Sequence, residues 1–296
     1  MRWEDFRRST NVEDRRGQPG GGGGMRMGGR GGLGLGTMVV LGLIGWALGI
    51  DPRILIGGAE MVMGDGQVAP QVAPAGPTGA PSDKVGQFAA AVLAQTEDVW
   101  SSILQQQANR RYEAPALVLF SGATQSGCGF AQAQMGPFYC PVDRKLYIDL
   151  AFFADMQRRL GAGGDFAFAY VIAHEVGHHI ENLIGILPKV QEMQRRASER
   201  DANALSVRVE LMADCFAGVW AHHAEKRWRI LEAGDLEEAL NAAAAVGDDR
   251  LQRAGTGRVV PDSFTHGSSD QRMRWLQAGL KSGSIAQCNT FEAQRL

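Results

Sequence analysis

VIAHEVGHHIENLIG, residues 171–185, is the stretch on which the interpretation of the whole chain depends. It contains the pattern H-E-x-x-H in His174, Glu175 and His178. The surrounding residues predict a helix, on which positions i and i+4 lie on one face, one turn apart. Both imidazoles can therefore reach one metal ion, while Glu175, about 100° round the helix, can reach a water on that ion. This arrangement is typical of zinc hydrolases, in which a third protein ligand completes the site.

The third ligand is predicted on a second helix, expected over residues 198–228. Glu210 and Asp214 lie four positions apart on one face of this helix, among apolar residues such as Leu211 and Phe216. An acidic pair on a solvated face fits these neighbours poorly, and buried carboxylates need a cation or a hydrogen-bond partner. We therefore predict that Glu210 binds the metal ion. Asp214 would accept a hydrogen bond from the far N–H of a metal-bound histidine and fix its tautomer.

The remaining histidines are less suited to this ion. The ring of His179, one position beyond the second ligand, points about 100° away on the helix, so we predict a flanking polar residue. His222 lies about 18 Å along the helix axis from Glu210 and cannot share its ion. His222 and His223 are expected to be solvated or to cap a helix. His266 lies in the loop before the last predicted helix.

Composition limits the class of protein. With 296 residues, the chain can form one large domain or two smaller ones with a buried core. A formal net charge of −2 gives no global field that points to nucleic acid, so no nucleic-acid partner is expected. The four cysteines lack C-x-x-C spacing, which argues against a cysteine zinc site and permits two disulfides in an oxidising compartment. Cys128 and Cys140 would close a loop of about a dozen residues.

The first 84 residues are predicted to lie outside the folded domain. Residues 1–32 carry seven Arg, four acidic residues and a run of five glycines, so they are predicted to be disordered. Residues 33–50 (LGLGTMVVLGLIGWALGI) carry no charge and, at about 1.5 Å per residue, are just long enough to cross the hydrocarbon core as a helix. Residues 51–84 include a Pro/Ala/Gly tract and are predicted to form an extended linker.

We interpret residues 33–50 as an uncleaved, single-pass transmembrane helix. The internal glycines disfavour a buried globular helix, and the long preceding segment without an A-x-A-like site disfavours a cleaved signal peptide. Seven Arg precede the stretch and only Arg53 lies just beyond it, which places the N-terminus in the cytoplasm. The rest of the chain is then expected outside, on the periplasmic or cell-surface side, in agreement with the even number of cysteines.

The folded domain is predicted over residues 85–296 as a predominantly helical α+β domain with a small sheet. Strand patterns cover residues 116–122 and, at the end of a hairpin, 146–150. Helical patterns cover residues 85–107, 165–185, 198–228, 235–252 and 268–283. Ser268 or Ser269 is expected to cap the last of these helices.

The motifs resemble those of a known family. HEVGHHIENLIGI, ELMADCFAGVWAHH and FTHGSSDQRMRW are similar to the neutral zinc metallopeptidase family of bacteria, the YpfJ-type proteins. MRWEDFRRSTNVEDRRG and GCGFAQAQMGPFYCPVDRKLYIDL extend the resemblance to nearly the whole chain apart from the linker. The combination of HExxH with ExxAD also resembles the wider gluzincin group. The resemblance implies a zincin-like fold that holds one zinc ion, with His174, His178 and Glu210 as ligands and Glu175 as base.

A further resemblance concerns THGSSDQR, which contains His266 and Arg272. It is similar to the T-H-P-x-x-x-x-R element of membrane-bound gluzincins, with Gly267 in place of the proline. In that group the element approaches the active site, which implies that His266 donates to the developing oxyanion. The alternative is a loop histidine that caps the last helix. We also expect a second disulfide between Cys215 and Cys288, which would hold the C-terminal tail on the zinc-binding helix.

These features predict a membrane-anchored zinc metallopeptidase, in which Glu175 assists the attack of a zinc-bound water on a peptide bond. Residues 145–150 are predicted to form the sheet edge that pairs with an extended peptide or protein substrate, through Tyr147, Ile148 and Asp149. One alternative is a membrane-tethered binding or assembly factor that keeps a zinc site without proteolysis. The intact Glu175 argues against it, because a structural site needs no base. Another alternative is an envelope adhesin or scaffold with the linker as its stalk.

Overall fold

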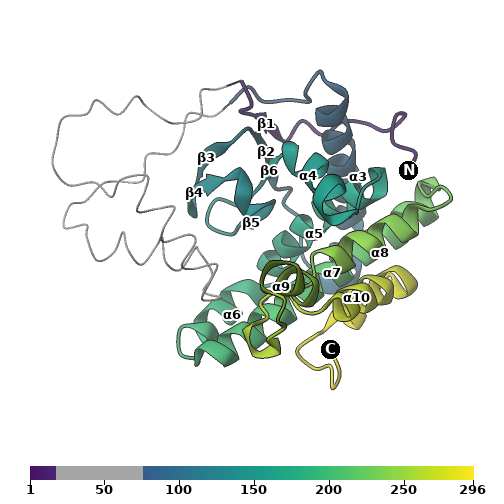
Figure 1. Ribbon diagram of the computed structural model, residues 1–296. Coiled ribbons are helices and arrows are strands. Elements are labelled where there is room, and N and C mark those ends of the chain that lie inside the picture. Colours follow the sequence, from purple (N-terminus) through teal and green to yellow (C-terminus); the bar gives the residue numbers. More distant parts are fainter. Residues whose placement is uncertain (18–75) are drawn as a thin grey trace, which may run out of the picture.

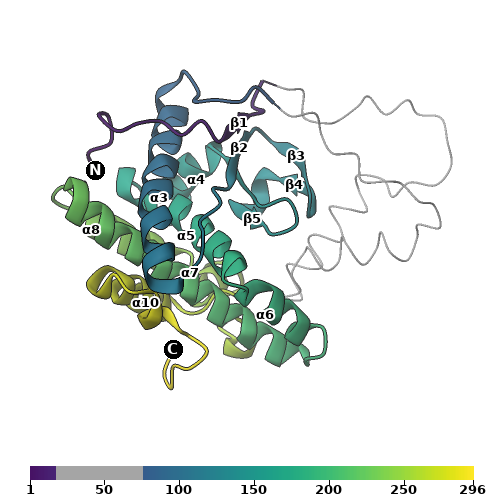
Figure 2. The ribbon, with the colours of Figure 1, turned by 180° about the vertical axis from the view of Figure 1, so that it is seen from behind.

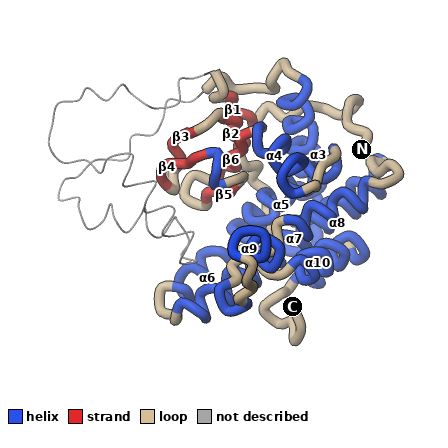
Figure 3. Tube along the Cα trace, viewed as in Figure 1, coloured by secondary structure: helices blue, strands red, loops and turns tan. Residues whose placement is uncertain are grey.

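Helices form most of the described part of the protein, and the strands gather at one side of them (Figure 3). The structure is a computed structural model that describes residues 1–17 and 76–296 (Figure 1). The predicted class, a mostly helical α+β fold with a small sheet, is confirmed for these residues.

The sheet has the strand order β1-β2-β6-β5. Strands β1, β2 and β6 are parallel, and β5 is antiparallel to β6. A separate hairpin of β3 and β4 follows β2. The strands are β1 (Val12–Asp14), β2 (Ala116–Phe120), β3 (Ala123–Ser126), β4 (Gly129–Gln132), β5 (Phe138–Cys140) and β6 (Lys145–Asp149).

This order corrects the prediction for residues 145–150. Tyr147, Ile148 and Asp149 belong to β6, which lies between β2 and β5 and is not an edge. Their side chains are buried, the Tyr147 hydroxyl donates to Asp143 at 2.5 Å, and Asp149 accepts from the backbone N–H of Gly122. The prediction failed because a strand in sequence does not show which neighbours it acquires through parallel pairing with distant segments.

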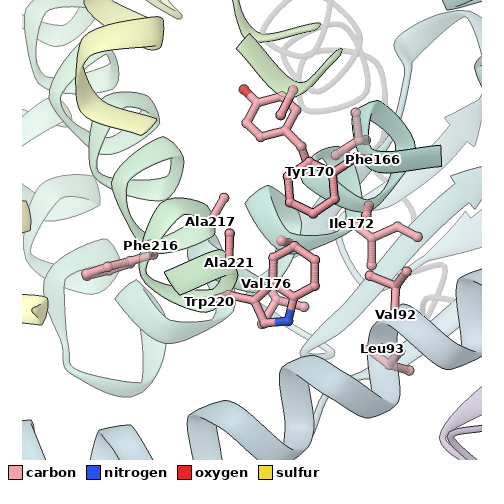
Figure 4. Close-up of a cluster of buried hydrophobic side chains, with 14 of the residues drawn as sticks. Val92, Leu93, Phe166, Tyr170, Ile172, Val176, Phe216, Ala217, Trp220 and Ala221 are labelled. Atoms are coloured by element: carbon pink, nitrogen blue, oxygen red, sulfur yellow. The ribbon is translucent and has the colours of Figure 1, made fainter. Parts of the chain in front are cut away.

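Three long helices form the centre of the domain. Buried side chains of α3, α5 and α7 meet in one apolar cluster, in which Trp220 stacks on Phe166 at 6.0 Å (Figure 4). The longer helices are α3 (Lys84–Ala108), α4 (Ala151–Leu160), α5 (Asp165–Leu183), α6 (Ile186–Gln194), α7 (Glu199–Trp228), α8 (Asp235–Ala245), α9 (Asp248–Thr256) and α10 (Ser269–Ser282). Short 3₁₀ turns are η1 (Ala133–Met135), η2 (Pro261–Ser263) and η3 (Ile285–Cys288).

Most predicted elements are confirmed. Ser198 caps α7 by accepting from the N–H of Asp201. Ser268 caps α10 by accepting from the N–H of Gln271, and its own backbone N–H donates to the side chain of Gln271. The single helix expected over residues 235–252 is instead two helices, α8 and α9, separated at Gly247. A side chain there would collide with the backbone of Ser269, so the close approach of α10 requires glycine.

Close helix contacts set the geometry around the H-E-x-x-H pattern. A Cβ at Gly177 of α5 would lie 2.9 Å from the carbonyl oxygen of Ala213 on α7, so glycine lets these helices approach. At Gly279 of α10 a Cβ would collide with the carbonyl of Cys215 on α7. Both contacts bring the polar side chains of α5, α7 and α10 within reach of one another.

Both expected disulfides are present. Cys128–Cys140 joins the turn between β3 and β4 to β5, and Cys215–Cys288 joins α7 to η3. The first holds the β3–β4 hairpin on the sheet, and the second holds the C-terminal segment on α7.

Residues 1–17 belong to the folded domain, and the prediction that they are disordered is wrong. Trp3 packs on Phe88 of α3 with ring centroids 5.4 Å apart, and Val12 is 1% exposed in β1. The N-terminal segment passes α3 and leads into β1 beside β2 (Figure 2). The charges that suggested disorder are paired here, since Glu13 contacts both Arg15 and Lys145. The folded unit also begins before the predicted boundary at residue 85, because residues 77–79 pair with β1.

The rest of the predicted N-terminal organisation concerns residues 18–75, which lie outside the described residues. This includes the predicted transmembrane helix at residues 33–50 and most of the predicted linker. Within residues 1–17 and 76–296, no helix is long and apolar enough to cross a membrane.

Candidate metal centre

Three predicted metal ligands meet between α5 and α7. His174 Nε2 lies 3.2 Å from Glu210 Oε2, and His178 Nε2 lies 3.6 Å from Glu210 Oε1. One candidate ligand atom from each residue lies within 4.8 Å of the others. Two ligand atoms about 2.05 Å from a tetrahedral zinc ion are roughly 3.3 Å apart, so these spacings suit one ion.

Each imidazole is held on its far side by a buried carboxylate. His174 Nδ1 lies 2.9 Å from Asp214 Oδ1, and His178 Nδ1 lies 2.9 Å from Glu181 Oε2. Both carboxylate residues are fully buried. A neutral imidazole that donates from Nδ1 presents the lone pair of Nε2 to the opposite side, where Glu210 lies. The two histidines are therefore oriented as metal ligands.

Arg272 of α10 holds Asp214 in place. Its guanidinium donates to the two Asp214 oxygens at 2.9 and 3.0 Å, and to the Tyr170 hydroxyl at 3.2 Å. The Tyr170 hydroxyl in turn donates to Asp214 Oδ1 at 2.5 Å. Burial disfavours the ionised form of Asp214, but Arg272 and His174 outweigh it and lower the pKa of this carboxyl. Asp214 therefore stays ionised and able to accept from His174.

The charges of the site favour a cation. Burial alone would lower the pKa of His174, but Asp214 and Glu210 outweigh it and raise the pKa to about 10. Two nitrogen donors and one carboxylate, in a site with more carboxylates than cationic side chains, fit a divalent ion such as zinc. The carboxylates around the two imidazoles are those of Glu175, Glu181, Glu210 and Asp214.

Glu175 faces the same cleft as the three candidate ligands. Glu175 is 6% exposed. Within the described part of the chain, its carboxylate forms no ion pair or side-chain hydrogen bond. A carboxylate that is not engaged by the protein can accept a proton from a water beside the ligands.

His266 also lines this cleft, from the loop that precedes α10. Asp248 fixes the loop, because its Oδ2 accepts from the backbone N–H groups of Thr265, His266 and Gly267 at 2.7 to 3.0 Å. Asp248 Oδ1 lies 3.3 Å from His266 Nδ1. Gly267 has φ 93°, which proline cannot adopt, so the loop must differ from the T-H-P element that it resembles.

His179 has a different environment from the other two histidines of α5. Its Nε2 donates to the carbonyl of Glu113 at 2.6 Å, and its Nδ1 lies 3.0 Å from the Tyr139 hydroxyl. Burial lowers the pKa of His179 to about 4. His179 is thus neutral and joins α5 to β5 and to the segment before β2.

The three candidate metal ligands line a cleft of about 360 Å³. One wall is the segment that leads into β5, with Met135, Gly136 and Pro137, and then Tyr139 of β5 itself. Apolar residues in or directly after several helices also line the cleft: Phe152, Val171, Leu187, Val209 and Val246. Tyr147, Ile148 and Asp149 are not among the lining residues.

Three residues of this site were not predicted from the sequence: Glu181, Tyr170 and Asp248. Glu181 and Tyr170 lie three positions after His178 and four before His174, so helical spacing could have identified them. Asp248 lies eighteen residues before His266, and no local pattern connects the two. Only the packing of α9 against the loop brings them together.

A buried two-helix site with H-E-x-x-H on one helix and a glutamate on the other defines a candidate zinc hydrolase. The chain matches the family described as "Putative neutral zinc metallopeptidase" over residues 1–291 and belongs to it. It is 49% identical over 296 residues to the uncharacterized protein YpfJ of Escherichia coli (strain K12), covering 98% of this chain and 99% of that protein. It is also 41% identical over 230 residues to an uncharacterized protein of Mycobacterium tuberculosis (strain H37Rv), covering 74% and 75% of the two chains. No solved structure matches the chain.

Proposed function

We propose that the protein is a zinc-dependent peptidase that hydrolyses peptide bonds in the cleft between α5, α7 and β5. The observation that carries this proposal is the convergence of His174, His178 and Glu210 beside the unengaged carboxylate of Glu175. A structural zinc site is normally closed by four protein ligands, whereas three ligands facing a cleft leave a position for water and substrate.

One zinc ion held by these three ligands would lower the pKa of a bound water and polarise the substrate carbonyl. Glu175 takes the proton from the water and then delivers it to the leaving nitrogen. His266, held by Asp248, donates a hydrogen bond to the oxygen of the substrate carbonyl as negative charge develops there. Asp214 and Glu181 keep the two imidazoles oriented throughout.

The substrate chain would lie along the wall formed by Gly136, Pro137 and Tyr139. This wall and the ligands of α5 and α7 line the same cleft, so a polypeptide between them has its backbone beside Glu175. The apolar lining on the helical side suits apolar side chains next to the cleaved bond. The Cys128–Cys140 disulfide would stabilise this wall, since it holds β5 to the neighbouring hairpin.

We also propose that the apolar residues 33–50 attach the peptidase to a membrane, with the catalytic domain on the extracytoplasmic side. The support is the uncharged, membrane-length sequence of this stretch and the presence of two disulfides, which form and persist in oxidising compartments.

The test compares the wild type, Glu175→Gln and the control Glu237→Gln, which changes an exposed glutamate on α8. Zinc content and cleavage of a broad peptide library are measured for each. We expect Glu175→Gln to retain zinc and to lose cleavage by about 1000-fold, within the usual range for a general base. The control should match the wild type. A zinc-loaded wild type that cleaves no peptide would contradict the proposal and favour a binding or assembly factor.

A further inference from the structure

The described residues that flank segment 18–75 lie side by side on the folded domain. The backbone N–H of Asp14 donates to the carbonyl of Pro77 at 3.0 Å, and that of Gly79 donates to the carbonyl of Val12 at 2.9 Å. Glu13 and Thr78 form an antiparallel bridge between these contacts. The described residues on either side of segment 18–75 therefore lie at one place on the domain.

Residues 1–17, which precede this segment, are an integral part of the domain. The N–H of Leu117 donates to the carbonyl of Asn11 at 2.8 Å, so β1 extends the sheet beside β2. The side chains of Ser9 and Asn11 donate to Glu97 of α3 at 2.6 and 2.8 Å. Residues 1–17 can form these contacts only in the compartment that contains the rest of the domain.

We infer that residues 1–17 and 76–296 lie on the same side of the membrane. The protein then contacts the lipid bilayer from that side and does not cross it. A single crossing by residues 33–50 would place β1 and β2 in different compartments. Exchange of β1 between two copies does not remove the conflict, because every copy has the same orientation. The inference rests on the proposed membrane contact and is independent of peptidase activity.

A second crossing that would return the chain to its starting side lacks a suitable sequence. Residues 51–75 contain Asp51, Arg53, Glu60 and Asp65, and no second apolar stretch of membrane length. Placing an Asp or Arg at the bilayer centre costs about 2.5 to 3.5 kcal/mol by insertion scales. The arginines before residue 33 consequently do not set an orientation, since that rule applies to segments that cross.

The experiment places one new cysteine in each segment of the full-length protein. Thr10→Cys and Gln106→Cys change exposed residues, and the four native cysteines are paired in disulfides. A membrane-impermeant maleimide is applied to spheroplasts and to inverted vesicles. We expect both positions to be labelled in the same preparation and protected in the other. Labelling of Thr10→Cys and Gln106→Cys from opposite faces would overturn the inference.

A third variant tests the lipid contact separately. Residues 33–50 are replaced by a Gly/Ser sequence of equal length in the Thr10→Cys background. We expect this protein to leave the membrane fraction with an unchanged melting temperature, because the β1–β2 pairing holds residues 1–17 on the domain. Recovery of the parent protein in the soluble fraction would overturn the lipid contact, whatever its peptidase activity.

Discussion

Two faces of α5 carry histidines in opposite electrostatic states. On one face, carboxylates outweigh the effect of burial and raise the pKa of His174 and His178. On the other, His179 contacts a phenol and a backbone carbonyl, and burial lowers its pKa to about 4. His178 and His179 are adjacent in sequence, so the neighbours supplied by other elements decide the state of each ring. One face is suited to bind a cation, and the other fixes α5 to the sheet.

The largest expected effect comes from removing the carboxylate of Glu210, which lies opposite both histidines of the first face. In Glu210→Gln, both histidines lose the charged group that lies opposite their Nε2 atoms. We expect zinc affinity to fall by more than about 100-fold, since loss of an outer hydrogen-bond partner alone typically costs 10 to 100-fold. Competition for zinc with a chromophoric chelator measures the affinity of each variant.

The exposed Glu237→Gln change again serves as the control for Glu210→Gln, because it removes one negative charge from a residue that does not line the cleft. If Glu210→Gln and this control bind zinc equally well, Glu210 is not a ligand, and the face of α5 that carries His174 and His178 is not the zinc site.

The face that carries the candidate metal ligands was largely predictable, because its pattern is local. His174, His178 and the pair Glu210 and Asp214 each follow helical i, i+4 spacing, which needs no knowledge of the fold. The other features depend on contacts between distant segments. The short, acidic β1 becomes a strand only through β2 and through the pairing of Glu13 with Arg15 and Lys145. The central position of β6 likewise follows from pairing with a strand twenty-nine residues earlier.

The face around His179 makes stability depend on pH. The pKa of His179 is about 4 in the folded protein and about 6.5 when exposed, so the unfolded chain binds the extra proton between these values. Stability is therefore fully present above pH 6.5 and falls as the pH is lowered toward 4. A difference of about 2.5 pKa units corresponds to about 3 kcal/mol. Urea unfolding of the zinc-free protein at several pH values measures this change.

The matched variant for this prediction is His179→Gln, whose amide can still donate to the Glu113 carbonyl but does not titrate. It should be less stable than the wild type at pH 7 and should lose about 3 kcal/mol less between pH 7 and 4. Equal pH dependence in the two proteins would show that other groups dominate and that His179 is not the neutral, buried ring described.

The smallest expected effects distinguish the two carboxylates behind the candidate metal ligands His174 and His178. Asp214 accepts from His174, Tyr170 and Arg272, so Asp214→Asn turns an amide N–H₂ toward at least one donor. Glu181 contacts His178 through one oxygen, while its other oxygen has no partner within the described residues, and burial raises its pKa to about 7. Glu181→Gln keeps an acceptor for His178 Nδ1 and loses little else.

We therefore expect zinc affinity to fall by about 100-fold in Asp214→Asn and by about 10-fold in Glu181→Gln, the two ends of the usual range for such partners. The Co²⁺ absorption spectrum of each variant adds a measure of ligand orientation that a general loss of stability would not change. A larger effect in Glu181→Gln than in Asp214→Asn would contradict this order. It would mean that the charge of Glu181, rather than its hydrogen bond, orients His178.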